Sequence, residues 1–167
     1  MGHPVLRERA RPLDKSDIRN AALQKLIDDM IDTMHEYHGV GLAAPQVHEG
    51  LRMFVAMLDE DPGAQSEAAV IINPEIIADG SGMEEGWEGC LSIPEIRGMV
   101  PRHTDIRLKA LDRTGRSIEL PLKDFQARVA QHETDHLDGV LFFDRMKSFG
   151  TLTFLDEYSR FWAKEEE

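Results

Sequence analysis

Two histidines four residues apart, His132 and His136, are the first residues of this chain whose types and spacing could do chemistry. Residues 124–131, which precede them, combine helix-forming residues with apolar side chains at helical spacing, and this pattern predicts a helix. A helix turns once in about 3.6 residues, so both imidazoles project from one face and can bind a single metal ion. Glu133 completes the His-Glu-x-x-His pattern of metallohydrolases, in which the carboxylate is the general base. The competing interpretation is a helix with two surface histidines.

A catalytic metal site of this kind needs a third protein ligand and keeps one position open for water. In metzincin peptidases that ligand is a downstream histidine, but Phe142 stands at its position. Glu157 lies at the distance typical of thermolysin-like peptidases, on a predicted helix. Cys90 lies upstream in a glycine-containing segment that can direct a thiolate toward a metal, although lone cysteines are commonly buried small hydrophobes. The residues alone leave Glu157 and Cys90 in competition.

The composition places the chain among single-domain globular proteins. It has 167 residues, 41% apolar and 30% charged, and we expect one domain over residues 1–167. The formal net charge of −12 argues against a broad phosphate-binding surface, so we expect no direct nucleic-acid binding. A single cysteine excludes an internal disulfide, and no apolar run approaches the roughly 18 residues that a membrane span needs. With no signal-peptide pattern at the N-terminus, the sequence predicts a cytoplasmic protein without membrane association.

The hydrophobic pattern predicts an α+β fold, with small mixed or antiparallel sheets around the central metal-binding helix and with an N-terminal and a C-terminal helix. The N-terminal helix is predicted to begin at an N-cap on Ser16 and to end near Gly39. The other predicted elements are an extended lead-in (3–15), strands (51–58, 70–73 ending at Pro74, and 75–78), an acidic loop (59–67), an irregular segment (80–98), a hairpin (104–111 with 117–122) and a helix (151–164).

Three segments resemble the signature segments of the peptide deformylase family, in the same order along the chain. They are Gly39-Val40-Gly41-Leu42-Ala43-Ala44-Pro45-Gln46, Glu88-Gly89-Cys90-Leu91-Ser92 and Gln131-His132-Glu133-Thr134-Asp135-His136. The resemblance runs along nearly the whole chain. It departs at the abrupt N-terminus, and the loop at 59–67 and residues 83–87 look like local elaborations. The three C-terminal glutamates differ from the basic helix with which some bacterial relatives contact the ribosome.

The resemblance implies a metal-dependent hydrolase that removes the N-formyl group from the initiator N-formylmethionine of newly made polypeptides and releases formate. Cys90, His132 and His136 would hold one divalent metal ion whose bound water attacks the formyl carbon, with Glu133 as general base and then general acid. The family is generally ferrous, so the resemblance implies Fe2+, while a thiolate and two imidazoles also suit Zn2+, Ni2+ or Co2+. The partners would be nascent peptides, met near the ribosome exit.

The resemblance also assigns roles around the reacting group. The Gln46 amide and the Leu91 backbone N–H would stabilise the negative charge that develops on the formyl oxygen. Val40 and Gly41 would contact the substrate, whose backbone could lie alongside them as an added strand. Arg97 would stand at the mouth of the pocket.

Helical spacing suggests further neighbours of the site. Phe125 and Val129 precede His132 on related helix faces and are candidates for the methionine pocket, with plain core packing as the alternative. Arg128 is then expected to point outward with its stem along the surface. We expect Asp135 and Asp138 to be exposed or capping residues. By the resemblance, Glu88 and Arg102 would pair behind the metal ligands.

Two functions of other kinds compete with this interpretation. A zinc endopeptidase that uses Glu157 would not need Cys90. A structural metal module, or an inert ribosome-associated factor, would close all four metal positions with protein ligands and has no use for a free carboxylate such as Glu133 beside the metal.

Overall fold

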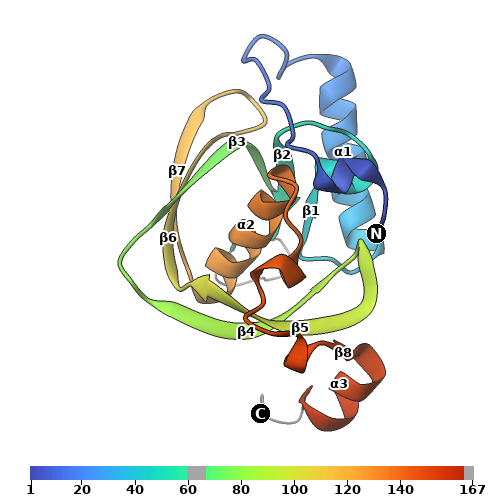
Figure 1. Cartoon of the computed structure of the whole chain (residues 1–167). Coiled ribbons are helices and arrows are strands. Elements are labelled where there is room, and N and C mark those ends of the chain that lie inside the picture. Colours follow the sequence, from blue (N-terminus) through green and yellow to red (C-terminus); the bar gives the residue numbers. More distant parts are fainter. Residues whose placement is uncertain (60–66, 164–167) are drawn as a thin grey trace.

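Helix α2 (Asp124–Leu137) lies at the centre of the fold with two antiparallel sheets curving around it, as Figure 1 shows for the computed structural model. The structure describes residues 1–59 and 67–163. One sheet has the order β1-β2-β3-β6-β7 and the other the order β4-β5-β8. The strands are β1 (Gly41–Ala43), β2 (Met53–Ala56), β3 (Ala69–Ala78), β4 (Met83–Cys90), β5 (Ile93–His103), β6 (Asp105–Leu111), β7 (Ser117–Lys123) and β8 (Thr153–Phe154). With the helices α1 (Ala21–Glu36) and α3 (Leu155–Phe161), this architecture confirms the predicted α+β class.

Strand β2 is buried on both faces because α1 and α2 cover opposite sides of the five-stranded sheet. Phe54 and Ala56 pack into the cluster that contains the inner face of α2. Met53 and Val55 pack into the cluster that contains α1. Successive residues of a strand point to opposite faces, so an unbroken apolar run is what a strand between two layers requires. This packing fixes one side of α2.

Helix α1 begins later than the sequence pattern predicts. Its N-cap is Asn20, whose side-chain oxygen accepts a hydrogen bond from the Ala22 backbone N–H at 2.8 Å. Residues 15–19 form turns instead, and Ile18 among them is fully buried. The predicted start at Ser16 is therefore wrong, because Asn20 supplies the cap and Ile18 is anchored in the core outside the helix.

Strand β3 continues through Pro74, where the sequence pattern predicted an end. Its pairing with β6 changes register between Ile72 and Glu75, and Asn73 has a positive φ of 52°. The Asn73 side chain exchanges two hydrogen bonds with the Leu13 backbone, at 2.9 and 2.8 Å. The bulge tolerates the missing N–H of proline, so one bulged strand replaces the two predicted strands.

The predicted irregular segment at 80–98 is wrong, since most of it forms the long antiparallel pair of β4 and β5. Its glycines do not break the strands but make room for side chains that cross them. A Cβ on Gly86 would lie 2.8 Å from the Arg128 guanidinium, and one on Gly98 would lie 2.7 Å from Met146. Residues 83–87, which the sequence indicated to be a local elaboration on the family pattern, are the first part of β4.

The C-terminal segment packs on the outer face of this strand pair. Phe154 of β8 pairs with Ile96 of β5, so the helix predicted over 151–164 shortens to α3. Trp87 of β4 contacts Tyr158 and Trp162, with ring centroids 5.0 and 5.5 Å apart. Within residues 1–59 and 67–163 no helix is both long and apolar enough to cross a membrane. Most of the predicted acidic loop at 59–67 and the terminal glutamates lie outside the described residues.

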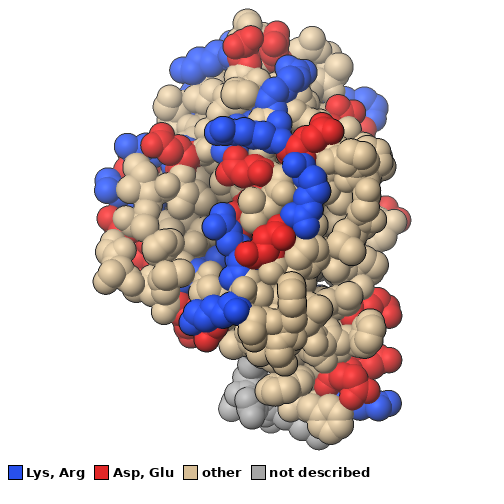
Figure 2. Space-filling model, viewed as in Figure 1, with Lys and Arg blue, Asp and Glu red and all other residues tan. Residues whose placement is uncertain are grey.

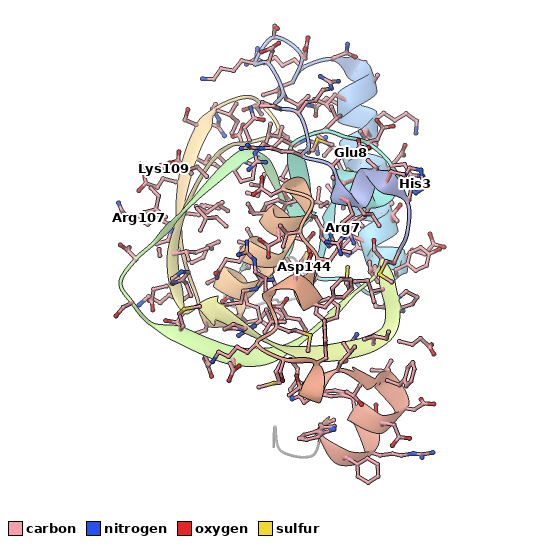
Figure 3. All side chains as sticks on the ribbon, viewed as in Figure 1. His3, Arg7, Glu8, Arg107, Lys109 and Asp144 are labelled. Carbon is pink, nitrogen blue, oxygen red and sulfur yellow. The ribbon has the colours of Figure 1, made fainter. Side chains whose placement is uncertain are left out.

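The sequence pattern predicted an extended N-terminal lead-in. The structure instead attaches this segment to the end of α2. Pro4–Arg7 forms a short 3-10 helix, and the Arg7 guanidinium pairs with Asp144 beyond α2 (Figure 3). Arg107 and Lys109 instead point outward from β6 in the same view. Gly139, just past the end of α2, has a φ of +71°, and a Cβ there would lie 2.6 Å from the Arg7 carbonyl oxygen.

We expect Gly139→Ala to destabilise the protein by more than Gly80→Ala. Both glycines have a positive φ, which costs an L-residue about 1–2 kcal/mol. Only Gly139 adds a backbone collision, because a Cβ on Gly80 meets nothing within 4 Å. Thermal and urea unfolding of the two variants measures the difference. Equal losses of unfolding free energy would show that the contact with Arg7 contributes nothing.

Candidate metal centre

Cys90, at the end of β4, meets His132 and His136, which project from one face of α2. One ligand atom from each residue lies within 4.8 Å of the others, and Cys90 Sγ is 3.3 Å from His136 Nε2. The Cys90 residue is only 9% exposed. Burial lowers the pKa of His136 well below its ordinary value, so this imidazole is neutral, the form that binds metal. One thiolate and two imidazoles form a donor set that fits a divalent transition metal.

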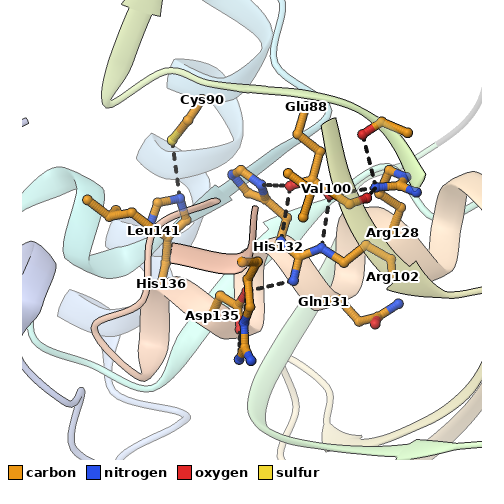
Figure 4. A network of polar contacts seen from close by, with 12 residues as sticks. Glu88, Cys90, Val100, Arg102, Arg128, Gln131, His132, Asp135, His136 and Leu141 are labelled. Atoms are coloured by element: carbon orange, nitrogen blue, oxygen red, sulfur yellow. Dashed lines mark hydrogen bonds and ion pairs between the residues drawn. The ribbon is translucent and has the colours of Figure 1, made fainter. Parts of the chain in front are cut away.

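A buried carboxylate orients the first histidine of this group. Glu88 Oε2 lies 2.9 Å from His132 Nδ1, which leaves Nε2 to face the other ligands (Figure 4). The Arg102 guanidinium donates to both Glu88 oxygens, at 2.9 and 3.0 Å. Burial by itself would raise the pKa of Glu88, but the hydrogen bonds to His132 and Arg102 lower it to about 2. Glu88 is therefore ionised, and the pairing with Arg102 lies behind the ligands.

Asp135 belongs to the same polar network, so the prediction of an exposed or capping residue is wrong for it. It is 6% exposed and accepts from Arg102 at 2.6 Å and from Arg145 at 2.8 Å. Asp138 is the exposed C-cap of α2 and pairs with Arg52 at 2.7 Å. Helical spacing could have predicted its inward position, since Asp135 follows His132 by three residues and shares its helix face.

Arg128 also points inward, against the prediction that it would point outward. Its Nη1 donates to Glu88 Oε1 at 2.9 Å and to the Val100 carbonyl at 2.7 Å (Figure 4). The sequence pattern failed here because Arg128 occupies the face that leads to His132. The apolar stripe of α2 that packs on the five-stranded sheet lies on another side of the helix.

Glu133 is a buried carboxyl beside the three ligands. It is 4% exposed, and its Oε2 has no hydrogen-bond partner among the residues that the structure describes. Burial raises its pKa to about 7, despite the opposing charges of His132 and Arg102. A Cβ on Gly41 would lie 2.3 Å from Glu133 Oε1, so β1 passes directly over the carboxyl. The position and the raised pKa suit a group that accepts and returns a proton near neutral pH.

The Gln46 amide is fixed with its donor side toward the ligands. Its Oε1 accepts from the Ala43 backbone N–H at 2.8 Å, so Nε2 must face the other way. Nε2 donates to Ser92 Oγ at 3.2 Å and lies 3.6 Å from Cys90 Sγ. Ser92 was not among the predicted site residues, although it stands in the same segment as Cys90.

The rival third ligand stands apart from this group. Glu157 lies on α3 and pairs with Arg160 at 3.4 Å, and the group of possible metal ligands among the described residues does not contain it. Phe142, at the metzincin histidine position, is 1% exposed and stacks against His132 at 6.5 Å between ring centroids. Phe142 also shares a buried cluster with Cys90, so it packs the site from behind.

The residues predicted to contact a substrate lie in three places: beside β1, next to Cys90, and on α2. Val40 and Leu91 are 46% and 41% exposed, and a Cβ on Gly39 would lie 3.1 Å from Leu91 Cδ1, so both stand beside the start of β1. The Arg97 guanidinium covers Gly89, next to Cys90.

The third group comprises the two helix residues. Phe125 is 56% exposed and lines a recess between α2 and β4 that Arg128 and Gly86 also line. Val129 is 5% exposed and packs in the core against the five-stranded sheet, which is the alternative that its spacing left open.

Comparison with known proteins identifies the arrangement. A model of the polypeptide deformylase family matches residues 1–151. Peptide deformylase 2 of Nostoc is 43% identical over 98% of this chain and 93% of its own length.

Solved structures agree with this similarity. The peptide deformylase of Thermotoga maritima superposes with a TM-score of 0.79 at 44% identity, covering 89% of this chain and 95% of that one. A class I type b peptide deformylase of Acinetobacter baumannii, solved with Met-Ala-Ser bound, gives a TM-score of 0.80 at 39% identity. That match covers 87% of this chain and 94% of the other.

We expect Cys90→Ala to lose the metal while Glu157→Ala keeps it. Two imidazoles without the thiolate hold a divalent ion weakly, whereas Glu157 takes no part in the ligand group. Elemental analysis of both variants after dialysis, alongside the unchanged protein, measures the metal content. Stoichiometric metal in Cys90→Ala would contradict the ligand assignment.

Proposed function

This chain belongs to the peptide deformylase family, and from that premise we propose that it removes the N-formyl group from peptides beginning with N-formylmethionine, releasing formate. The observation that carries the proposal is the buried Glu133 carboxyl beside a three-ligand metal group, with one oxygen that has no hydrogen-bond partner among the described residues. A structural metal site closes all four positions with protein ligands and needs no such carboxyl. An endopeptidase that uses Glu157 lacks support, because Glu157 pairs with Arg160 and does not belong to the ligand group.

We propose Fe2+ as the native ion, held by Cys90, His132 and His136. Zn2+, Co2+ and Ni2+ suit the same donors, and metal analysis of protein purified without oxygen decides among the four. When bound, such an ion lowers the pKa of a water at its open position and polarises a carbonyl oxygen.

The protein groups around the ligands then have separate tasks. Glu133 takes a proton from the attacking water and delivers it to the amine nitrogen as the bond from that nitrogen to the formyl carbon breaks. Negative charge develops on the formyl oxygen during the attack. Gln46 Nε2, already directed toward Cys90, donates to that oxygen together with the Leu91 backbone N–H. A neutral amide stabilises the charge without competing as a metal ligand.

We propose that the substrate lies along β1 as an added strand. This strand is at the edge of the five-stranded sheet, so one side of its backbone is not paired with another strand of that sheet. Gly41 brings this edge against Glu133, and a larger residue there would displace the carboxyl. Val40 and Leu91 offer exposed apolar surface beside it, Arg97 stands at the mouth, and the recess lined by Phe125 is proposed to take the methionine side chain.

The surface suits a peptide substrate better than a nucleic acid. Figure 2 shows acidic and basic side chains interspersed on one face instead of a continuous basic patch. We therefore propose nascent peptides near the ribosome exit as partners, with no direct contact to nucleic acid. A cytoplasmic location is proposed because a reducing compartment preserves the free Cys90 thiol.

N-formylmethionyl peptides should release formate, and their N-acetyl counterparts should react far more slowly. One methyl in an apolar pocket usually changes the activation free energy by about 1–3 kcal/mol. The methyl of the acetyl group would in addition displace the carbonyl from Gln46 and Leu91. Formate release and chromatography of matched peptides measure both reactions. Equal rates on the two acyl groups would reject the proposal. Cleavage of internal peptide bonds would support an endopeptidase instead.

We expect Glu133→Gln to keep the metal and the fold but to lower kcat by roughly 10²–10⁴-fold, the usual contribution of a positioned proton-transfer group. The amide has the same shape as the carboxyl but cannot accept the proton. Steady-state kinetics with metal analysis tests this, and the exposed Glu119→Gln provides the control. A near-normal kcat in Glu133→Gln would contradict the assigned mechanism.

A further inference from the structure

We propose that Arg128 is a positioning residue of the metal centre, which acts on His132 through Glu88, and that Gly86 is the strand position that admits its guanidinium. The inference rests on the proposed function only in so far as the metal centre is catalytic. Arg128 stands one helical turn before His132, on the same face of α2.

The Arg128 guanidinium bridges the helix and both strands of the β4–β5 pair. Nη1 donates to Glu88 Oε1 at 2.9 Å and to the Val100 carbonyl at 2.7 Å, and Nη2 donates to the Glu84 carbonyl at 2.8 Å. Its side chain is only 13% exposed. These contacts attach α2, which carries two ligands, to the strand that carries Cys90. A planar group with several fixed donors can make all of them, whereas a lysine ammonium cannot.

Glu88 links Arg128 to the metal ligand. Its Oε1 accepts from Arg102 and Arg128, both at 2.9 Å, and its Oε2 is 2.9 Å from His132 Nδ1. Arg102 alone can hold the carboxylate as a fork. The second guanidinium approaches Oε1 from the helix side and restricts rotation of the carboxylate about that fork. We infer that losing Arg128 lets the carboxylate and the His132 ring reorient together.

Gly86 explains why the guanidinium can lie where it does. A Cβ on this residue would be 2.8 Å from Arg128 Cζ and Nη2 and 3.0 Å from Nε. The guanidinium therefore lies directly against the bare Cα of the strand. Because the colliding atoms are the far end of a side chain, an alanine at this position should displace Arg128 and leave the strand in place. Gly86 and Arg128 thus form one unit, and their substitutions should not be independent.

The first test measures the ligand geometry without substrate. Cobalt(II) is loaded into the unchanged protein, Arg128→Leu and Arg128→Lys, and the visible absorption and the affinity for cobalt in competition with a chelator are recorded. We expect Arg128→Leu to shift the absorption bands and to weaken metal binding about 10–100-fold, as loss of a supporting group around a metal site typically does. Arg128→Lys should recover part of this effect. The control is Arg107→Leu on β6, whose side chain is 42% exposed and pairs with Asp79 away from the metal centre, and it should change neither quantity.

The second test is a double-mutant cycle. Gly86→Ala alone should lower kcat and shift the cobalt bands in the same direction as Arg128→Leu. In the Arg128→Leu background, Gly86→Ala should have little further effect, because the group it displaces is already absent.

Two results would overturn the proposal. One is an unchanged cobalt spectrum and affinity in Arg128→Leu, even if kcat/KM falls, because Arg128 would then act only on the substrate in the recess. The other is additive effects of the two substitutions. Neither result depends on which acyl group is hydrolysed, so failure of the deformylase assignment would appear separately, in the formate assay of the unchanged protein.

Discussion

The buried carboxylate of Glu88 is the interaction on which the rest of the site depends. Removing a charge from water costs several kcal/mol unless ionic and hydrogen-bonding partners surround it, and a half-satisfied network would be worse than an apolar core. Here Arg102, Arg128 and His132 satisfy the carboxylate from three sides. Two of those partners come from α2 and one from β5, while Glu88 itself belongs to β4. The same contacts therefore hold the helix, the strand pair and the metal ligand in one geometry.

Strand β4 connects this network to the periphery of the fold. Glu88 and Cys90 face α2, whereas Trp87, the residue before Glu88, faces the opposite way and packs against Tyr158 and Trp162. Alternation of side chains along the strand makes both contacts possible at once. The C-terminal helix thus supports the ligand-bearing strand from behind. Its aromatic residues have a structural reason to pack there, independent of any contact with the ribosome.

The sequence predicted the parts of the site that depend on local spacing. The α2 helix, its two histidines and Glu133 follow from a four-residue step, and the competing Cys90 and Glu157 were separated only by the resemblance and then by the structure. What it missed depends on pairing between distant segments. Residues 80–98 read as irregular because glycine lowers strand propensity, and the reason for Gly86 lies on α2, in Arg128. The sequence pattern indicated surface charges at Asp135 and Arg128 for the same reason, since the partner of Asp135 is Arg102 on β5 and the partner of Arg128 is Glu88 on β4.

Two carboxyl groups flank His132, and their environments push their pKa values in opposite directions. Glu88 and Glu133 are both buried, but Glu88 receives guanidinium and imidazole donors that lower its pKa to about 2. Glu133 lies under the bare backbone of Gly41, and one of its oxygens has no hydrogen-bond partner in the part of the chain that the structure describes. Burial raises its pKa to about 7. A pair of carboxyls separated in this way can divide the work, one holding a fixed charge and the other exchanging a proton. The polar network around Arg102 stabilises the fixed charge of Glu88. Glu133 lies outside that network, and this permits it to exchange a proton. A hydrogen-bond donor added beside Glu133 would satisfy its carboxyl oxygen and lower the pKa of the carboxyl. The site would then be less able to catalyse hydrolysis.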